Sequence, residues 1–469
     1  MQKAIRKTSK LWLIPIIASS LCFALSLRRA IWSDEAATIY RISLPWKQFL
    51  YASIHKDDAV HATYYAILKL LHFAVGNNLI KLRFFSGFCI GFAAFGFGKL
   101  LSPYFSRKKV LIGQLFFVAL PSVLDYGTDA RSYALSLALI TWLSYLFLKI
   151  LKKADKQEKF GLHLILFTAL EIFATYIFIY NSLIGIALLC FILVTQRFAL
   201  IKIFLFVESI VFTLTCPLFY LGSVQIKQIG WISRGFFSSI GDTLSVAFES
   251  RSWQLAVTCV LLFSLMVFFL IVTRLSMTPA LRELFIWASF ITVIPSMVLI
   301  FSSFIHPILT QRYLVPFTSG FALLILLAFT RMNRNWRTFL MILFLSGLFG
   351  ASYFNFSSSG RDDWGIKTRI VLQHAHSGGA VMASSRFYEE VLVTQPIKGA
   401  TLLRFPNSPK LPQGVRLPKI ETLAANPSQV FIIPLTKVHP EDIQILKNNG
   451  YKLRASYKVG PGFIMEFQK

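Results

Sequence analysis

The chain has 469 residues, of which 55% are hydrophobic and only 15% are charged, and its formal net charge is +27. Globular domains carry about 25% charged residues, so this composition excludes an ordinary soluble protein. The positive charge does not indicate a nucleic-acid partner, because no basic run lies within the pattern of a soluble binding fold. Lys and Arg recur instead in short clusters between apolar segments, which predicts a polytopic membrane protein in contact with membrane lipid.

Apolar segments long enough to cross a bilayer, at about 20 residues each, predict about eleven transmembrane helices. They run near Leu11–Leu27, Leu79–Leu101, Val110–Leu124, Ser132–Leu151, Leu162–Ile179, Asn181–Val194, Ile203–Leu221, Trp253–Thr273, Leu284–Phe304, Tyr313–Thr330 and Phe339–Tyr353. The apolar run from Phe160 to Val194 is too long for one helix, and we place a break at Tyr180–Asn181. The short segment Val110–Leu124 suggests a helix that ends inside the protein.

A long loop, residues 28–78, follows the first predicted helix, and two adjacent acids stand near its start. A carboxylate in the hydrocarbon core costs several kcal/mol, so Asp34 and Glu35 must lie at the interface or in a wet cavity. Further along, Ile42–Ile54 and Thr63–Val75 show helical periodicity but are too short and polar to span the membrane. This pattern favours helices that lie in the interface plane.

Basic clusters recur in every second predicted loop, on the side that holds the N-terminus. They are Lys3–Lys10, Arg107–Lys109, Lys152–Lys159, Arg197/Lys202, Arg274/Arg282 and Arg331–Arg337. We expect that side to be the cytoplasm, because loops rich in Lys and Arg are retained there. An odd number of crossings then places the C-terminus outside, in a multi-pass protein of the cell membrane.

The character of the chain changes after residue 361, where the apolar stretches shrink to strand length. Strands are predicted at Ala380–Ser384 and Val430–Pro434, helices at Trp364–His376 and Glu441–Asn449, and a terminal hairpin at Lys452–Val459 and Phe463–Phe467. The predicted fold class is therefore an α-helical polytopic membrane domain over residues 1–353, followed by a small extracytoplasmic α/β domain over residues 361–469.

Polar side chains suited to chemistry gather in three of the predicted outer loops. They are Asp57, Asp58, His61, Tyr64 and Tyr65 in the first loop, Asp125, Asp129, Arg131 and Tyr133 between the third and fourth spans, and His306, Arg312 and Tyr313 between the ninth and tenth. Such a set suits a phosphorylated lipid substrate. Arginine binds phosphate with a planar, charged fork, and a carboxylate can take a proton from an attacking hydroxyl.

These residues also have purely structural explanations. Arg131 or Arg312 could be an interfacial side chain whose charged head reaches water. His61 could be a structural histidine, and Asp57 and Asp58 could form a solvated turn. The coincidence of all these groups on one side favours a functional site.

Two further acids, Glu171 and Glu208, fall within predicted spans. Because a charge in lipid is costly, both must face the protein interior. There they could pair with a buried base as easily as they could contact a substrate.

Four motifs occur in order along the chain. They are W-x-D-E-A at Trp32–Ala36, D-A-V-H-x-x-Y-Y at Asp58–Tyr65, D-A-R-x-Y at Asp129–Tyr133 and R-Y-L at Arg312–Leu314. This pattern resembles the bacterial C-fold membrane glycosyltransferases, the family of the protein O-mannosyltransferases and the lipid A aminoarabinose transferase. The resemblance spans most of the first 353 residues, and the tail carries little of it.

The resemblance implies a polyprenyl-phosphate-linked sugar as donor, mannose-like or arabinose-like. It also implies an extracytoplasmic acceptor hydroxyl on a protein, lipid or polysaccharide, and inversion at the anomeric carbon. No cofactor is required, since such a donor needs no nucleotide, although Asp57 and Asp58 could still hold a divalent metal.

Site roles also follow from the resemblance. Asp34 inherits the role of general base, and Glu35 orients the acceptor or supports Asp34. The donor phosphate is expected to bind Arg131, Arg312 and His61, and the sugar or acceptor is expected to contact Asp58, Tyr64, Asp129 and Tyr133. Many relatives carry Glu where this chain has Asp129, one methylene shorter.

Two other classes of function compete with this interpretation. A transporter or flippase of a lipid-linked sugar would show internal repeats and broken helices in matching halves, and no such repeat is visible. A noncatalytic scaffold that displays the C-terminal domain would leave the outer acids and arginines unexplained.

Overall fold

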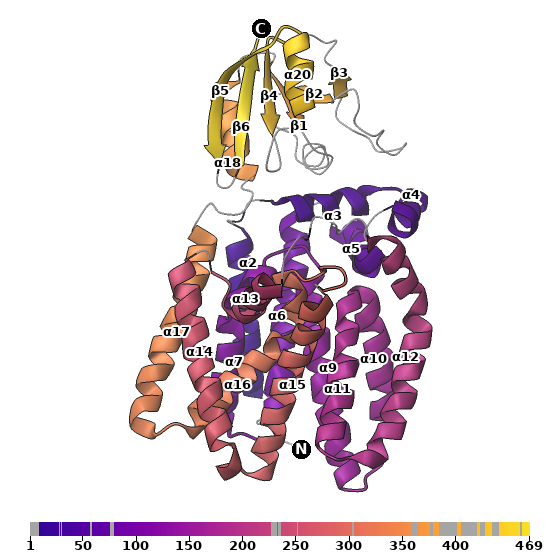
Figure 1. Ribbon diagram of the computed structural model, residues 1–469, viewed down its shortest axis with the longest axis vertical. Helices are drawn as coiled ribbons and strands as arrows, with labels where there is room; N and C mark the ends of the chain where they lie inside the picture. Colours follow the sequence, from indigo (N-terminus) through magenta and orange to yellow (C-terminus); the bar gives the residue numbers. More distant parts are fainter. Residues whose placement is uncertain are drawn as a thin grey trace. The chain divides into compact units, whose positions relative to one another are not determined.

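The computed structural model describes residues 9–27, 29, 31–56, 59–75, 79–226, 232, 236–250, 252–302, 304–357, 364–375, 379–383, 401–404, 420–422, 427–433, 440–459 and 462–469. The chain divides into two compact units (Figure 1). The first, which we call the helical unit, comprises Met1–Leu27, Ser53–Tyr64 and Ile80–Phe356. The second comprises Arg28–Ala52, Tyr65–Leu79 and Ser357–Lys469.

Helices make up most of the helical unit, and in Figure 1 the long ones run side by side. In chain order they are α2 (Leu13–Ser26), α6 (Leu79–Leu101), α7 (Arg107–Ala119), α8 (Pro121–Gly127), α9 (Tyr133–Asp155), α10 (Gly161–Ile177), α11 (Leu183–Val194), α12 (Phe198–Val224), α13 (Phe236–Ser245), α14 (Trp253–Thr273), α15 (Pro279–Ser302), α16 (Thr318–Arg331) and α17 (Arg334–Ser357). Short 3-10 turns join several of them: η1 (Ser9–Trp12), η3 (Ala59–His61), η4 (Ile179–Ser182), η6 (Val246–Phe248), η7 (Arg274–Ser276) and η8 (Gln311–Phe317).

Within the described residues, seven helical segments are long and apolar enough to cross a membrane, or eight if the bent pair α7–α8 counts as one. All eleven predicted segments are helical. However, Leu13–Ser26, Gly161–Ile177 and Ile179–Val194 are apolar helices shorter than the usual span. The prediction of a polytopic helical membrane protein is confirmed.

Two helix breaks within the apolar region have clear local causes. Between α7 and α8 the chain bends by 66°, because Leu120 is extended ahead of Pro121, which lacks an N–H and opens the next helix. All seven residues of α8 are buried. At the end of α10, Phe178 is extended (φ −160°, ψ 116°), and η4 follows at once. The break predicted at Tyr180–Asn181 falls within η4.

The loop after α2 holds three short helices, α3 (Ser33–Ser43), α4 (Trp46–Tyr51) and α5 (Ala62–Val75), with the π-type turn η2 (Ala52–Lys56) after α4. The prediction of one helix over Ile42–Ile54 is wrong. Leu44 is extended ahead of Pro45, where α4 begins. The buried Lys69 ammonium donates to the carbonyls of Ile42 and Leu44, which lie at the end of α3.

The C-terminal region forms a six-stranded mixed sheet with strand order β3-β2-β1-β4-β6-β5. Its elements are α18 (Trp364–His374), β1 (Ala380–Ala383), β2 (Thr401–Arg404), β3 (Ile420–Thr422), β4 (Gln429–Ile433), α20 (Pro440–Asn448), β5 (Lys452–Val459) and β6 (Gly462–Gln468). The first four strands are parallel to one another, and the terminal hairpin β5–β6 adds antiparallel to β4.

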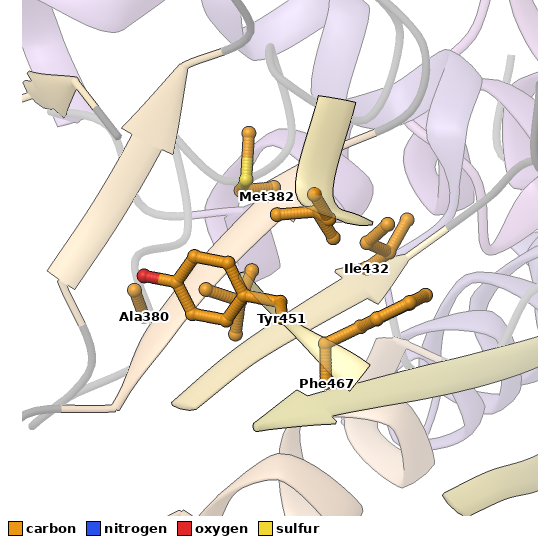
Figure 2. Close-up of a cluster of buried hydrophobic side chains, with 7 residues drawn as sticks. Ala380, Met382, Ile432, Tyr451 and Phe467 are labelled. Atoms are coloured by element: carbon orange, nitrogen blue, oxygen red, sulfur yellow. The ribbon is translucent and has the colours of Figure 1, made fainter. Parts of the chain in front are cut away.

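One face of this sheet packs against α20 through Leu446 (Figure 2). Ala380, Met382 and Ile432 line that face together with Tyr451 and Phe467. The predicted strands and hairpin are confirmed here, whereas β2 and β3, only four and three residues long, were not predicted.

Candidate active site

One end of the helical unit gathers basic loops, and we call it the basic end. Arg197, just before α12, donates to Asp155 at the end of α9 and to Glu283 near the start of α15, both at 2.8 Å. Arg331 donates to Ser276, which joins the end of α16 to the turn after α14. Burial raises the pKa of Tyr104 to about 12, and Glu283 adds to that rise. Loops far apart in the sequence therefore meet at this end.

His61 lies at the opposite end of the helical unit. It contacts the start of α9, whose 23 residues at about 1.5 Å each separate it from Asp155. The His61 ring is 3% exposed, and its Nδ1 lies 2.8 Å from the Ser132 hydroxyl in a hydrogen bond. The ring stacks on Phe178 with centroids 5.1 Å apart and an interplanar angle of 5°. His61 is thus held rigidly where η3, α9 and the end of α10 meet.

A cluster of aromatic rings extends from His61 to the loop before α16. Tyr133 meets His61 edge-on at 6.0 Å and Phe178 at 5.7 Å. Tyr313 contacts Phe178 at 5.5 Å and stacks on Tyr180 at 4.7 Å. We call His61, Tyr133, Phe178, Tyr180 and Tyr313 the aromatic cluster; it joins three regions of the chain that the sequence had marked as outer.

Both candidate arginines are sequence neighbours of residues that belong to this cluster or bind it. The Arg312 guanidinium lies 6.0 Å from the centroid of the adjacent Tyr313 ring and is partly exposed. Arg131 immediately precedes Ser132, the partner of His61, and is only 6% exposed. A side chain this buried does not fit the alternative of an interfacial arginine whose head reaches water.

Asp129 is fully buried in the turn between α8 and α9. The turn is fixed by its backbone: Arg131 N–H donates to the Asp129 carbonyl at 2.8 Å, and the Ser86 hydroxyl donates to the same carbonyl at 2.5 Å. Tyr126 also packs edge-on against Tyr133 at 5.1 Å. This turn therefore presents Asp129, Arg131 and Tyr133 from one rigid backbone segment.

The remaining candidates are described within their own units. Asp34 and Glu35 occupy the first turn of α3 in the second unit, with Asp34 partly exposed and Glu35 fully buried. A carboxylate there is favoured by the helix dipole. Tyr64 is buried in the helical unit. The expectation that Asp34 lies beside Arg131 and Arg312 stays a prediction.

Asp57 and Asp58 lie outside the described residues. Across the parts of the chain that the structure describes, no group of three or more His, Cys, Asp or Glu side chains is placed to hold a metal ion. A metal role for Asp57 and Asp58 therefore stays a prediction.

Sequence reasoning missed Ser132, Phe178 and Tyr180 as parts of the site. Phe178 and Tyr180 sit in an apolar run where an aromatic residue is unremarkable, and their partner Tyr313 is more than a hundred residues away. The one local signal was the helix break at this point, since chain breaks inside apolar runs often line sites.

No protein-family model matches the chain, and no curated protein matches it by sequence. Among solved structures, the apo crystal structure of ArnT from Cupriavidus metallidurans superimposes with a TM-score of 0.56 at 11% identity, covering 97% of each chain. The chain has the fold of ArnT. A second ArnT structure from the same organism, bound to undecaprenyl phosphate, also gives a TM-score of 0.56, at 12% identity, and again covers 97% of each chain. The resemblance drawn from the four motifs is confirmed at the level of the fold.

Proposed function

We propose that this protein is a membrane glycosyltransferase. It transfers a sugar from a polyprenyl-phosphate donor to an acceptor hydroxyl on the extracytoplasmic side, with inversion at the anomeric carbon. The observation that carries the proposal is the ArnT fold over 97% of both chains, with one of those neighbours bound to undecaprenyl phosphate. The fold alone does not decide function. The residues at the aromatic cluster give the proposal its second support.

Donor binding is assigned to Arg131 and Arg312, with His61 between the elements that carry them. Glycosyl transfer passes through an oxocarbenium-like state in which negative charge grows on the leaving phosphate oxygen. Fixed arginines stabilise that charge more in the transition state than before it. Burial strengthens the effect for Arg131, because water does not screen a charge that is only 6% exposed.

Acceptor activation is assigned to Asp34. The acceptor oxygen attacks the anomeric carbon while the bond from that carbon to the phosphate oxygen breaks. The hydroxyl proton goes to the Asp34 carboxylate, and polyprenyl phosphate leaves. Glu35 supports Asp34 or orients the acceptor, and Tyr64, Asp129 and Tyr133 contact the sugar or acceptor, together with Asp58. This scheme requires no metal or nucleotide, although a divalent metal at Asp57 and Asp58 stays a prediction.

The orientation belongs to the same proposal. The basic end faces the cytoplasm, as the positive-inside rule expects, and the aromatic cluster then faces the outside. A lipid-phosphate donor suits that side, because it delivers an activated sugar where nucleotide sugars are absent.

A flippase of a lipid-linked sugar is the second candidate. The observation that favours it is the pair Glu171 and Glu208 within membrane helices, since intramembrane acids often mark transport pathways. The experiment that separates the two uses purified protein in liposomes with a panel of radiolabelled polyprenyl-phosphate sugars. A transferase releases one polyprenyl phosphate for each sugar moved to an acceptor, whereas a flippase moves the intact donor between leaflets.

A further inference from the structure

Glu171 lies near the middle of α10, deep in the helical unit and away from the aromatic cluster. Its side chain is 0% exposed, and neither of its carboxyl oxygens has a hydrogen-bond partner within the described residues. Glu208 lies on α12, and its Oε1 is likewise buried without a partner there. An unsatisfied buried acceptor is costly, and a buried unpaired charge is more so.

Helix register brings the two acids to the same depth. The Tyr176 hydroxyl donates to the Leu214 carbonyl at 2.7 Å, which fixes α10 against α12. The helices run in the same direction, and Glu171 and Glu208 precede that contact by five and six residues. Glu171 and Glu208 therefore lie at about the same level on two neighbouring helices.

The third helix of the group, α11, leaves room for the pair. At Gly185 a Cβ atom would collide with the Glu208 carboxyl group, so the absence of a side chain at this position gives that carboxyl its space. Figure 1 shows α10, α11 and α12 as neighbours in the bundle, and both α10 and α11 contact α12.

The described helices α10, α11 and α12 place no base beside the pair. Residues 161–194 contain no Lys or Arg, and α12 carries only Lys202, which is exposed and about 9 Å along the helix from Glu208. None of the ion pairs within the described residues includes Glu171 or Glu208. The other titratable groups on α10, η4, α11 and α12 and on their packing partners η3, α9 and α15 are His163, Tyr176, Tyr180, Cys190, Cys216, Tyr220, His61, Tyr133, Tyr145, Lys149, Lys152, Lys153, Asp155, Arg282 and Glu283.

We propose that Glu171 and Glu208 form an intramembrane proton-binding site that holds one proton between the two carboxyl groups at neutral pH. Two carboxylates cannot both stay ionised at close range in an apolar medium. One proton removes the repulsion and supplies the missing donor for a short O–H···O⁻ hydrogen bond. A metal cation fits this site less well than a proton. Hard cations such as Ca²⁺ are coordinated by six to eight oxygens, and the described residues offer no group of three side chains that could hold a metal ion.

The proton would also connect the membrane core to the aromatic cluster. By joining the Glu171 and Glu208 carboxyl groups, the proton holds α10 against α12. Helix α10 leads directly into η4, which carries Tyr180. This inference does not depend on the transfer reaction, and it is tested without measuring activity.

The test is infrared spectroscopy of the full-length protein in lipid nanodiscs. A protonated-carboxyl carbonyl band is expected at neutral pH, lost in a Glu171→Gln/Glu208→Gln double variant and lost from the wild type as pH rises. Gln matches Glu in shape and is neutral, so the double variant is expected to fold. Glu158→Gln, which removes an exposed glutamate that pairs with Lys153, is the control and should leave the band unchanged.

A second measurement needs no variant. An apolar carbodiimide adds to protonated carboxyl groups, so an adduct is expected on Glu171 or Glu208 at neutral pH and not on Glu283, which is paired with Arg197. A wild-type spectrum without the band would overturn the proposal. Loss of the band or adduct on adding NaCl at constant ionic strength would also overturn it, because the ligand would then be a metal cation.

Discussion

At the scale of single residues, the candidate site combines positions that local sequence could and could not reveal. Arg131 and Arg312 are recognisable because each stands in a short motif with tyrosine, D-A-R-x-Y or R-Y-L, in a predicted outer loop. The residues that hold His61 in place are not recognisable in this way, because Ser132 and Phe178 are unremarkable in their local sequence. What fixes the His61 ring is a hydrogen bond and a stacked aromatic ring from two different helices.

Arg312→Lys tests the donor-phosphate assignment. Lysine keeps the positive charge but loses the planar fork that makes two parallel hydrogen bonds to a phosphate. Since a hydrogen bond to a charged group contributes about 1.5–3 kcal/mol, donor affinity should fall about tenfold or more, with expression unchanged. Titration of the purified variant with a polyprenyl-phosphate sugar measures this. Equal donor affinity in variant and wild type would remove Arg312 from the site.

At the scale of helices and strands, most elements were predictable from hydrophobic pattern, and the errors have specific causes. The helical period over Ile42–Ile54 was visible, but Pro45 divides the segment because the residue before a proline avoids helical backbone angles. β2 and β3 are too short to show an alternating pattern. The aromatic cluster depends on contacts between distant segments, such as Tyr180 with Tyr313, and such contacts leave no local pattern.

Ion pairs at the basic end are expected to hold helix ends together. Arg197→Gln removes two charge-assisted hydrogen bonds at once, to Asp155 and Glu283. Because Asp155 is half exposed, the loss is discounted to about 1–2 kcal/mol. Thermal unfolding in detergent should therefore occur at a lower temperature than in the wild type. Glu158→Gln, in an exposed pair with Lys153, is the matched control and should leave unfolding unchanged; equal unfolding of Arg197→Gln and this control would contradict the role of Arg197.

Acid should loosen the sheet of the C-terminal region through Glu466, which lies on the face opposite the packed core. Burial alone would raise the pKa of this carboxyl, but hydrogen bonds from Tyr457 and Gln429, together with Arg454, outweigh it and hold the pKa below its usual value. A lowered pKa contributes stability that is present above the pKa of the unfolded state and lost as pH falls through the folded value.

The measurement is hydrogen exchange of β5 and β6 peptides in the full-length protein, corrected for intrinsic rates, from pH 7 down to about pH 3. Protection should fall below about pH 4.5, near the ordinary pKa of a glutamate. Glu466→Gln should be less protected than the wild type at pH 7 and should lack this acid-dependent loss. A wild-type sheet equally protected at both ends of the range would contradict the role of Glu466.

At the scale of the whole molecule, membrane character and helical fold were accessible from composition together with the lengths and positions of the apolar segments. Orientation rests on the basic clusters. The structure gathers Arg197, Arg331 and their partners at one end of the helical unit and the aromatic cluster at the other.

Reporter fusions after Lys469 test the orientation. A periplasm-dependent alkaline phosphatase should be active there, and a fluorescent protein that folds only in the cytoplasm should stay dark, because the C-terminus is expected outside. A fusion after Lys156, in the loop between α9 and α10, is the matched control with the opposite expectation. The reverse pattern would invert the topology and move the aromatic cluster to the cytoplasmic side.

Asp34 is proposed to remove the acceptor proton during transfer from a polyprenyl-phosphate sugar. Asp34→Asn keeps size and hydrogen bonding but cannot accept that proton, and loss of a general base costs about 10²–10⁴ in rate. Asp34→Glu should retain part of the activity, and Glu35→Gln, the neighbouring control, should be milder. Thermal unfolding of each variant accompanies the assay.

The measurement is sugar transfer from the lipid donor by purified protein, comparing Asp34→Asn with the wild type. The Asp34→Asn protein is expected to be stable, with a transfer rate reduced at least about a hundredfold. A stable variant that transfers sugar at the wild-type rate would contradict the mechanism, and a wild-type protein that uses no polyprenyl-phosphate sugar in the panel would contradict the proposed function itself.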